Sequence, residues 1–121
     1  MDLCEMEEEV ASDALDTSVC AQADVHLVEE ALAVQLAETF KVLSDPTRVR
    51  IVSALARGYL CVHQLAEALE LTHSAVSHQL GTLREMRLVT FVKEGRHVYY
   101  ALDDDHIAAL YRLGLEHIQH R

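Results

Sequence analysis

The sequence lacks any apolar run of about 18 residues, the length that a membrane-spanning helix needs, so we expect no membrane span. Basic residues are missing from its start, MDLCEMEEE, where a secretory signal peptide would need them, so we do not expect secretion. Cysteine is scarce: Cys4, Cys20 and Cys61 are an odd number and lie far apart, which excludes a closed disulfide framework. Free thiols are typical of a reducing compartment, and we expect a cytoplasmic location.

Lysine and arginine are absent from residues 1–30, which contain ten aspartate and glutamate residues. Residues 31–121 contain ten acidic residues and all ten lysine and arginine residues of the chain, so their formal charges cancel. The whole net charge of -10 therefore belongs to residues 1–30, and it does not argue against a nucleic-acid partner for the remainder. We predict that residues 1–24, which are acidic and weakly periodic, form a flexible N-terminal arm.

Apolar periodicity predicts two helices in the first half of the remaining chain. The first covers residues 25–43 and ends where Asp45 or Ser44 can cap a second helix. Pro46 then occupies the first turn of that second helix, where its missing N–H removes no hydrogen bond. We expect Gly58 to close the second helix as a left-handed cap.

Two short helices are predicted next, over residues 62–69 and 74–85. Residues 70–72 form a three-residue turn between them, and Thr72 can cap the second of the two helices. Two short helices joined by such a turn make a helix-turn-helix.

A β-hairpin is predicted directly after the helix-turn-helix. Residues 88–92 pair with residues 97–102, both rich in β-branched or aromatic side chains, and Gly95 supplies the positive φ of the turn. A last helix starts after the acidic residues 103–105 and runs to the end. The predicted fold class is mainly α with a β-hairpin wing: a winged helix-turn-helix with N- and C-terminal dimerisation helices, in one DNA-binding and dimerisation domain over residues 25–121.

Hydrogen-bonding side chains gather on one face of the second helix of the helix-turn-helix. Val76, Leu80 and Leu83 are expected to face inward, which leaves short polar side chains outward to reach phosphates and base edges in a major groove. Basic residues flank the end of this helix and the hairpin tip. The alternative is a plain solvated helix and a hairpin with ordinary surface charge. The predicted DNA contacts are His73, Ser74, Ser77, His78, Arg84, Arg87, Lys93 and Arg96.

The last helix carries a heptad seam with leucine at its centre and histidine at its ends. Its members are His106, Leu110, Leu113, His117 and His120. His106 and His117 are eleven residues apart, about 16 Å along one helix, too far to share one ion. Two antiparallel copies would bring Asp104 and His106 of one chain to His117 and His120 of the other, a site suited to Zn(II) or Co(II). Alternatively, the histidines are only polar edges of a dimer seam.

A second, thiolate-rich metal site is a further hypothesis. Cys61 and His63 lie two residues apart at a helix start, while Cys4, Cys20 and the lone His26 come from the N-terminal part of the chain. An arm folded onto Cys61 would favour soft ions such as Cu(I) or Cd(II), or share Zn(II). The alternatives are a Cys61 that serves as a small buried hydrophobe and arm cysteines without a ligand role.

Five short stretches match the motifs of one known family. They are LSDPTR at residues 43–48, LCV at 60–62, SAVSHQL at 74–80, GRHVYY at 95–100, and the Asp-x-His and His-x-x-His pairs of the last helix. Residues from about 33 to 121 therefore resemble the ArsR/SmtB family of metal-sensing repressors, most closely its zinc-sensing, metallothionein-repressor branch.

The resemblance implies a homodimer that binds operator DNA when metal-free and releases it when loaded with metal. It also implies that the last helix holds the interfacial site, that His117 reaches the backbone near Arg87, and that Cys61 joins N-terminal cysteines. Where the family often has Cys or Asp, this chain has His63 and Gln64. Of these two, His63 is the better metal ligand.

We therefore expect a repressor that Zn(II), or a similar ion such as Cd(II), Co(II) or Cu(I), releases from DNA, derepressing metal-resistance genes. A thiol-based redox-sensing DNA-binding regulator is the alternative. We expect no enzyme, because a metallohydrolase needs an open zinc position beside a general base, and the predicted site fills all four positions. A zinc-storage protein would not need the wing or the serine-rich helix.

Overall fold

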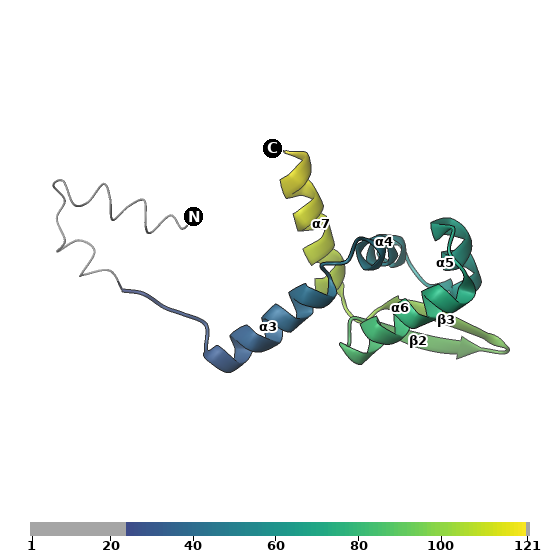
Figure 1. Ribbon diagram of the computed structural model, residues 1–121, viewed down its shortest axis with the longest axis horizontal. Helices are drawn as coiled ribbons and strands as arrows, with labels where there is room; N and C mark the ends of the chain where they lie inside the picture. The colour runs from purple at the N-terminus through teal and green to yellow at the C-terminus, as the bar shows by residue number, and fades with distance from the viewer. Residues whose placement is uncertain (1–23, 121) are drawn as a thin grey trace. The chain divides into compact units, whose positions relative to one another are not determined.

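The computed structural model describes residues 24–120, and Figure 1 gives the order of its elements. The helices are α3 (Glu30–Val42), α4 (Pro46–Leu55), α5 (Val62–Leu69), α6 (His73–Glu85) and α7 (Asp105–Gln119). The strands are β1 (Leu60–Cys61), β2 (Val89–Glu94) and β3 (His97–Leu102). None of the described helices is both long and apolar enough to cross a membrane.

Helix α3 begins at Glu30, so the predicted start at Val25 is wrong. Residues 24–29 have no regular secondary structure, and Leu27 is 86% exposed. Packing of an apolar face supplies most of the stability of a protein helix, and the apolar side chains of Val25, Leu27 and Val28 are exposed. Glu30 also suits the first turn, because its carboxylate faces the positive end of the helix dipole.

Helix α4 starts as predicted. The Asp45 carboxylate caps it by accepting a hydrogen bond from the Arg48 backbone N–H at 3.0 Å, and Pro46 is its first residue. At the other end the prediction is wrong in detail: Gly58 has a φ of +141°, far from the left-handed helical value. Glycine is still suited to this position, because other residues avoid that φ.

The helix-turn-helix has nearly the predicted bounds. α5 ends at Leu69, and the turn of residues 70–72 is set by Glu70, whose φ of +57° lets the Leu71 N–H donate to the Ala66 carbonyl at 3.0 Å. The Thr72 hydroxyl oxygen accepts from the Ala75 N–H at 3.0 Å and caps α6, as predicted. α6 begins at His73, one residue before the predicted start.

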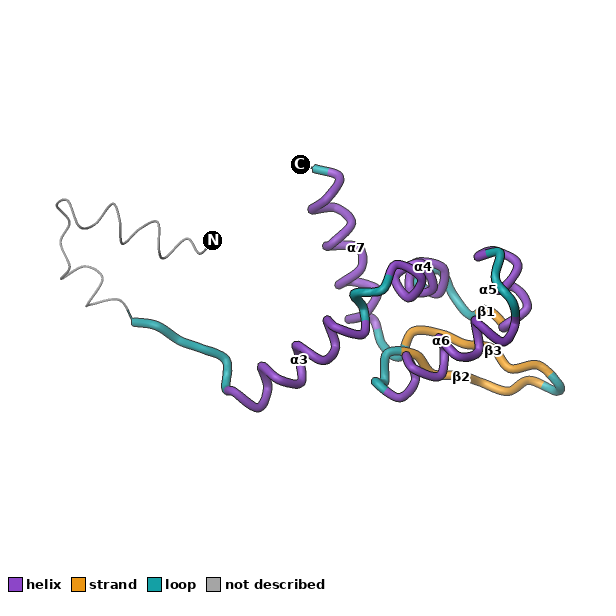
Figure 2. The backbone as a smooth tube through the Cα atoms, in the orientation of Figure 1, coloured by secondary structure: helices purple, strands orange, loops and turns teal. Residues whose placement is uncertain are grey.

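The hairpin is confirmed, and a third strand joins it (Figure 2). β2 and β3 pair antiparallel around a turn in which Gly95 has a φ of +62°. β1 pairs with the other edge of β3, with Leu60 opposite Tyr100, and the sheet order is β1-β3-β2. Strand β1 was not predicted, because a two-residue strand has no periodicity to detect.

The core lies between the helix-turn-helix, α4 and the start of β2. Val76, Leu80 and Leu83 on α6 are fully buried, as predicted, and they pack with Ile51 of α4 and Leu65 of α5. Burial of one such side chain stabilises the fold by about 1.5–3 kcal/mol. This core therefore fixes which face of α6 is left for other contacts. Helices α4 to α6 and the β2–β3 hairpin together form a winged helix-turn-helix, as predicted.

Candidate DNA-reading and metal-binding surfaces

The solvent-facing side of α6 carries the side chains that the sequence analysis assigned to DNA. Ser74, Ser77 and His78 are exposed, on the opposite face from the buried Val76 and Leu80. These short side chains can donate to and accept from base edges and phosphates, while the first N–H groups of α6 favour an anion. The surface therefore has the polarity that a recognition helix needs.

Arg48 holds α6 in place, a role the sequence analysis missed. Its Nε–H donates to Oε1 of Gln79 on α6 at 2.8 Å, and a terminal guanidinium nitrogen donates to the Val42 carbonyl at 3.2 Å. The same side chain thus connects the recognition helix to the C-terminal end of α3. The Arg48–Gln79 hydrogen bond could not be predicted from the spacing of residues in the sequence, because the two residues are far apart in the chain.

The end of α6 is joined to the wing through Arg84. Its guanidinium carbon lies 4.1 Å from the centre of the Phe91 ring on β2, a cation–π contact. Arg87 follows α6 with a φ of +59°, and its N–H donates to the Arg84 carbonyl at 2.9 Å. Both arginines are exposed, so they can still meet a phosphate. Arg84 therefore also positions the wing against the recognition helix.

Lys93 and Arg96 lie at the tip of the hairpin, on either side of the turn that contains Gly95. Both side chains are exposed, and the β2–β3 tip extends away from the helices in Figure 2. A projecting pair of cations is suited to contacts with a DNA backbone.

Asp104 and His106 are brought together at the start of α7. Asp104 caps the helix: its Oδ1 accepts from the backbone N–H groups of His106 at 2.9 Å and Ile107 at 3.3 Å. Its other oxygen, Oδ2, lies 3.4 Å from Nδ1 of His106. Desolvation acts in the opposite direction, but hydrogen bonds from His106 and Ile107 and the charge of His106 outweigh it and lower the pKa of Asp104. A carboxylate that is ionised and pre-oriented suits a metal ligand.

His117 and His120 lie at the opposite end of α7, one in its last turn and one at its C-cap, and both are exposed. His106 and His117 are separated by about 16 Å of helix. Within residues 24–120, no three metal-ligating side chains gather around one point. One chain alone therefore does not assemble the four predicted ligands, and the predicted site requires a second copy.

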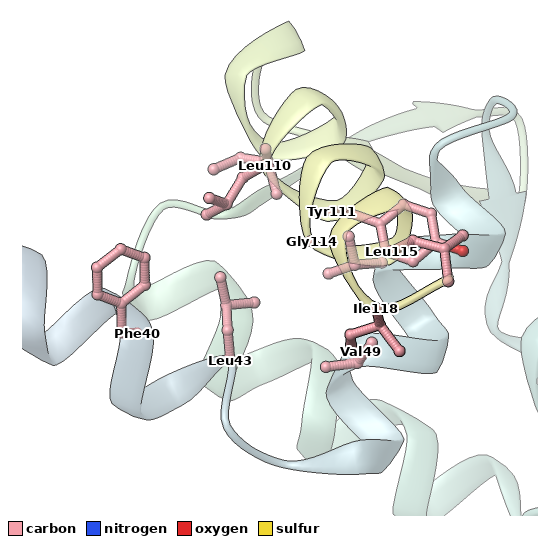
Figure 3. Close-up of a pocket in the computed structure, with 10 residues that line it drawn as sticks. Phe40, Leu43, Val49, Leu110, Tyr111, Gly114, Leu115 and Ile118 are labelled. Carbon is pink, nitrogen blue, oxygen red and sulfur yellow. The ribbon is translucent and has the colours of Figure 1, made fainter. Parts of the chain in front are cut away.

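An apolar groove lies along α7, with a volume of about 360 Å³ (Figure 3). In Figure 3, Phe40 and Leu43 of the α3 end lie across the groove from Leu110. Leu113 and Ile118 are 63% and 60% exposed, and α3 has no buried residue. A stripe of large apolar side chains that is exposed to solvent marks an interaction site for another apolar surface. It includes the leucines at the centre of the predicted dimer seam.

The residues around Cys61, the centre of the predicted thiolate site, make contacts with one another and with α6. Cys61 is half-buried and precedes α5, and its N–H donates to Oε1 of Gln64 at 2.9 Å, so Gln64 serves the helix start. His63 instead contacts His73 on α6. Cys4 and Cys20 lie outside the described residues, while His26 contacts the Asp24 carboxylate at 3.1 Å.

Known proteins with similar sequences are bacterial regulators. Residues 45–90, from the α4 cap into β2, match a family described as bacterial regulatory protein, arsR family. The chain is 53% identical over 87 residues to a transcriptional repressor SmtB homolog from Synechocystis sp., covering 72% of this chain and 66%, just under two thirds, of that relative. It is 42% identical over 88 residues to the HTH-type transcriptional regulator NmtR from Mycobacterium tuberculosis, covering 73% of each.

Solved structures of similar fold are DNA-binding regulators too. The AntR antimony-specific transcriptional repressor superposes with a TM-score of 0.72 at 35% identity, covering 88% of this chain and 95% of that one. Apo-NmtR in solution gives 0.69 at 37% identity, covering 83% and 84%. A homodimeric winged helix-turn-helix DNA-binding domain from Mycobacterium bovis gives 0.71 at 28% identity, covering 81% and 91%.

Proposed function

This chain belongs to the ArsR/SmtB family of bacterial regulatory proteins, and from that membership we propose that it is a metal-responsive transcriptional repressor. The metal-free homodimer binds operator DNA, and Zn(II) or a similar heavy-metal ion releases it, so that metal-resistance genes are expressed. One observation carries the proposal: α7 holds an oriented carboxylate–histidine pair at its start, two histidines at its end, and uncovered leucines between them.

The DNA-binding part of the proposal rests on α6 and the wing. Two copies would present two α6 helices to successive major grooves, roughly 34 Å apart on one face of the duplex. Ser74, Ser77 and His78 would contact base edges or phosphates, with His73 at the start of the helix. Lys93 and Arg96 would neutralise phosphates beside them.

The metal part rests on the chemistry of the donors. Three imidazoles and one carboxylate suit a tetrahedral Zn(II) or Co(II) ion, and Oδ1 of Asp104 caps α7 while its Oδ2 lies beside the ring of His106. His106 completes one half of the donor set, and His117 and His120 of the partner chain complete the other. We propose Zn(II) as the inducer, and Co(II), Cd(II) and Cu(I) are to be compared with it.

The coupling between the two surfaces would pass through the elements on which α7 packs. α7 contacts α4 and β3, and Arg48 connects α4 to α6. By the family resemblance, we propose that His117 reaches the backbone near Arg87, at the exit of α6. A coupling of about 1–3 kcal/mol would change operator affinity roughly 5- to 150-fold.

The thiolate site remains a second part of the proposal. The ligands Cys61, Cys4 and Cys20, with His63, would bind a further ion in each chain. Because thiolates are soft ligands, this ion would be a soft one such as Cu(I) or Cd(II). Free thiols also support a cytoplasmic location, and the kinship with transcriptional regulators supports a role other than catalysis.

The test is a metal titration of the purified homodimer that reads bound metal and DNA release together, on operator DNA selected from genomic fragments. We expect two Zn(II) ions per dimer to release DNA, and four bound ions if the cysteines also take part. His117→Ala with His120→Ala is expected to remove the response, while Glu116→Ala, an exposed acid on the same turn, is the matched control. Operator affinity that zinc leaves unchanged would refute the proposal. Peroxide-sensitive DNA binding without a zinc response would favour the thiol-based redox regulator.

A further inference from the structure

Two histidines from different helices face each other in the helix-turn-helix. Nδ1 of His63, the second residue of α5, lies 3.3 Å from Nε2 of His73, the first residue of α6. The ring centres are 5.4 Å apart and the planes are inclined by 67°. Both residues are exposed, so nothing in the core forces the rings together.

The separation of the two nitrogens is that of two ligands of one metal ion. Nitrogens that each lie about 2.0–2.1 Å from a tetrahedral ion are about 3.3–3.4 Å apart. The observed 3.3 Å falls within this range. The exposure of both rings leaves the other coordination positions to water or to an incoming ligand.

Glu67 orients the first of these imidazoles. Its Oε2 lies 3.4 Å from Nε2 of His63, the ring nitrogen that faces away from His73. A carboxylate beside Nε2 favours the tautomer with its proton on that nitrogen, which leaves a lone pair on Nδ1 for a metal ion. Glu67 therefore acts as a positioning residue.

We propose that His63 and His73 form a metal-binding site inside the helix-turn-helix of each chain, for a borderline divalent ion such as Cu(II), Ni(II) or Zn(II). In the metal-free state the Nε2–H of His73 donates to Nδ1 of His63. When the ion binds, this proton moves to Nδ1 of His73, and both facing nitrogens become ligands. The order of divalent affinities makes Cu(II) the tightest of the three.

This site differs from both parts of the proposed function, although it shares His63 with the thiolate site. It needs one chain only, whereas the α7 ligands need two, and it uses no thiolate. Both histidines lie in first turns, where the helix dipole disfavours a cation, so we expect weaker binding than at a four-ligand site. The ion would tie α5 to α6 at the edge of the DNA-reading surface.

The experiment uses the full chain with His117→Ala and His120→Ala, which removes two ligands of the α7 site, and with Cys4→Ser, Cys20→Ser and Cys61→Ser, because free thiols bind copper and reduce Cu(II). This variant is titrated with Cu(II) alone. We expect one ion per chain, with two imidazole nitrogens in its electron paramagnetic resonance spectrum. Adding His73→Ala is expected to weaken binding at least tenfold, and adding the matched His78→Ala, an exposed histidine later on α6, is expected to leave it unchanged.

Two more variants separate the possible explanations. Glu67→Gln is expected to weaken binding about tenfold and keep the stoichiometry. Restoring Cys61 is expected to have no effect. Binding that appears only when Cys61 is restored would assign the ion to the thiolate site and overturn the proposal. So would a chain that binds no Cu(II). His73→Gln serves as a second variant if circular dichroism shows that His73→Ala is unfolded.

Discussion

The apolar stripe on α7 predicts that replacing Leu113 weakens self-association and leaves the fold of each chain intact. Leu113 is 63% exposed in the single chain, so it contributes little to the core but would be covered by a second copy. Full burial of a leucine is worth about 1.5–3 kcal/mol, and covering the exposed part would contribute about 1–2 kcal/mol per chain. A symmetric dimer contains the residue twice, which doubles the effect to about 2–4 kcal/mol.

Leu113→Ala is therefore expected to raise the dimer dissociation constant roughly 30- to 900-fold. Sedimentation equilibrium over a range of protein concentrations measures this constant directly. Arg112→Ala, at the neighbouring exposed position of α7, is the matched control and should leave it unchanged. A dissociation constant that is the same for Leu113→Ala and for the unaltered chain would refute the assignment of this face to the dimer.

Three further predictions follow from the described contacts. Thr72→Ala removes the cap on the Ala75 N–H and should lower the free energy of unfolding by about 0.5–2 kcal/mol in urea titrations, whereas an unchanged value would contradict the capping role. Lys93→Ala with Arg96→Ala should weaken DNA binding at all sequences and, because the dimer contains each residue twice, reduce the slope of log affinity against log salt by about four; a change confined to one base position would assign them to base reading instead. The lowered pKa of Asp104 means that its carboxylate stabilises the fold above the ordinary value of 3.8, and that this stability is lost as the pH falls through the folded value. The difference in melting temperature between the unaltered chain and Asp104→Asn should therefore become smaller as the pH is lowered below the ordinary value of 3.8.

Local signals in the sequence were sufficient for most of the fold. The turn at residues 70–72, the Thr72 cap, the buried face of Val76 and Leu80, and the Gly95 turn all depend on neighbours in the chain, and all are confirmed. The start of α3 was predicted too early, because apolar spacing alone does not say whether a helix has something to pack against.

Contacts between distant segments could not be predicted. The pairing of β1 with β3, the Arg48–Gln79 hydrogen bond and the approach of His63 to His73 all depend on how the helices are angled after folding. One signal was present but not used: Glu67 lies one helical turn after His63, the spacing at which side chains meet. The α7 ligands could be placed at two ends of one helix, and their meeting depends on a second copy.

The central claim is that two chains share each metal ion at α7, and mixed dimers test it most directly. One chain carries Asp104→Asn with His106→Ala, and the other carries His117→Ala with His120→Ala. Neither variant alone should bind Co(II) at this site, whereas a dimer of the two restores one complete set of four ligands. The account predicts that mixing restores one tightly bound Co(II) per mixed dimer, with a tetrahedral absorption spectrum. Mixed dimers that bind no more Co(II) than either variant alone would contradict it.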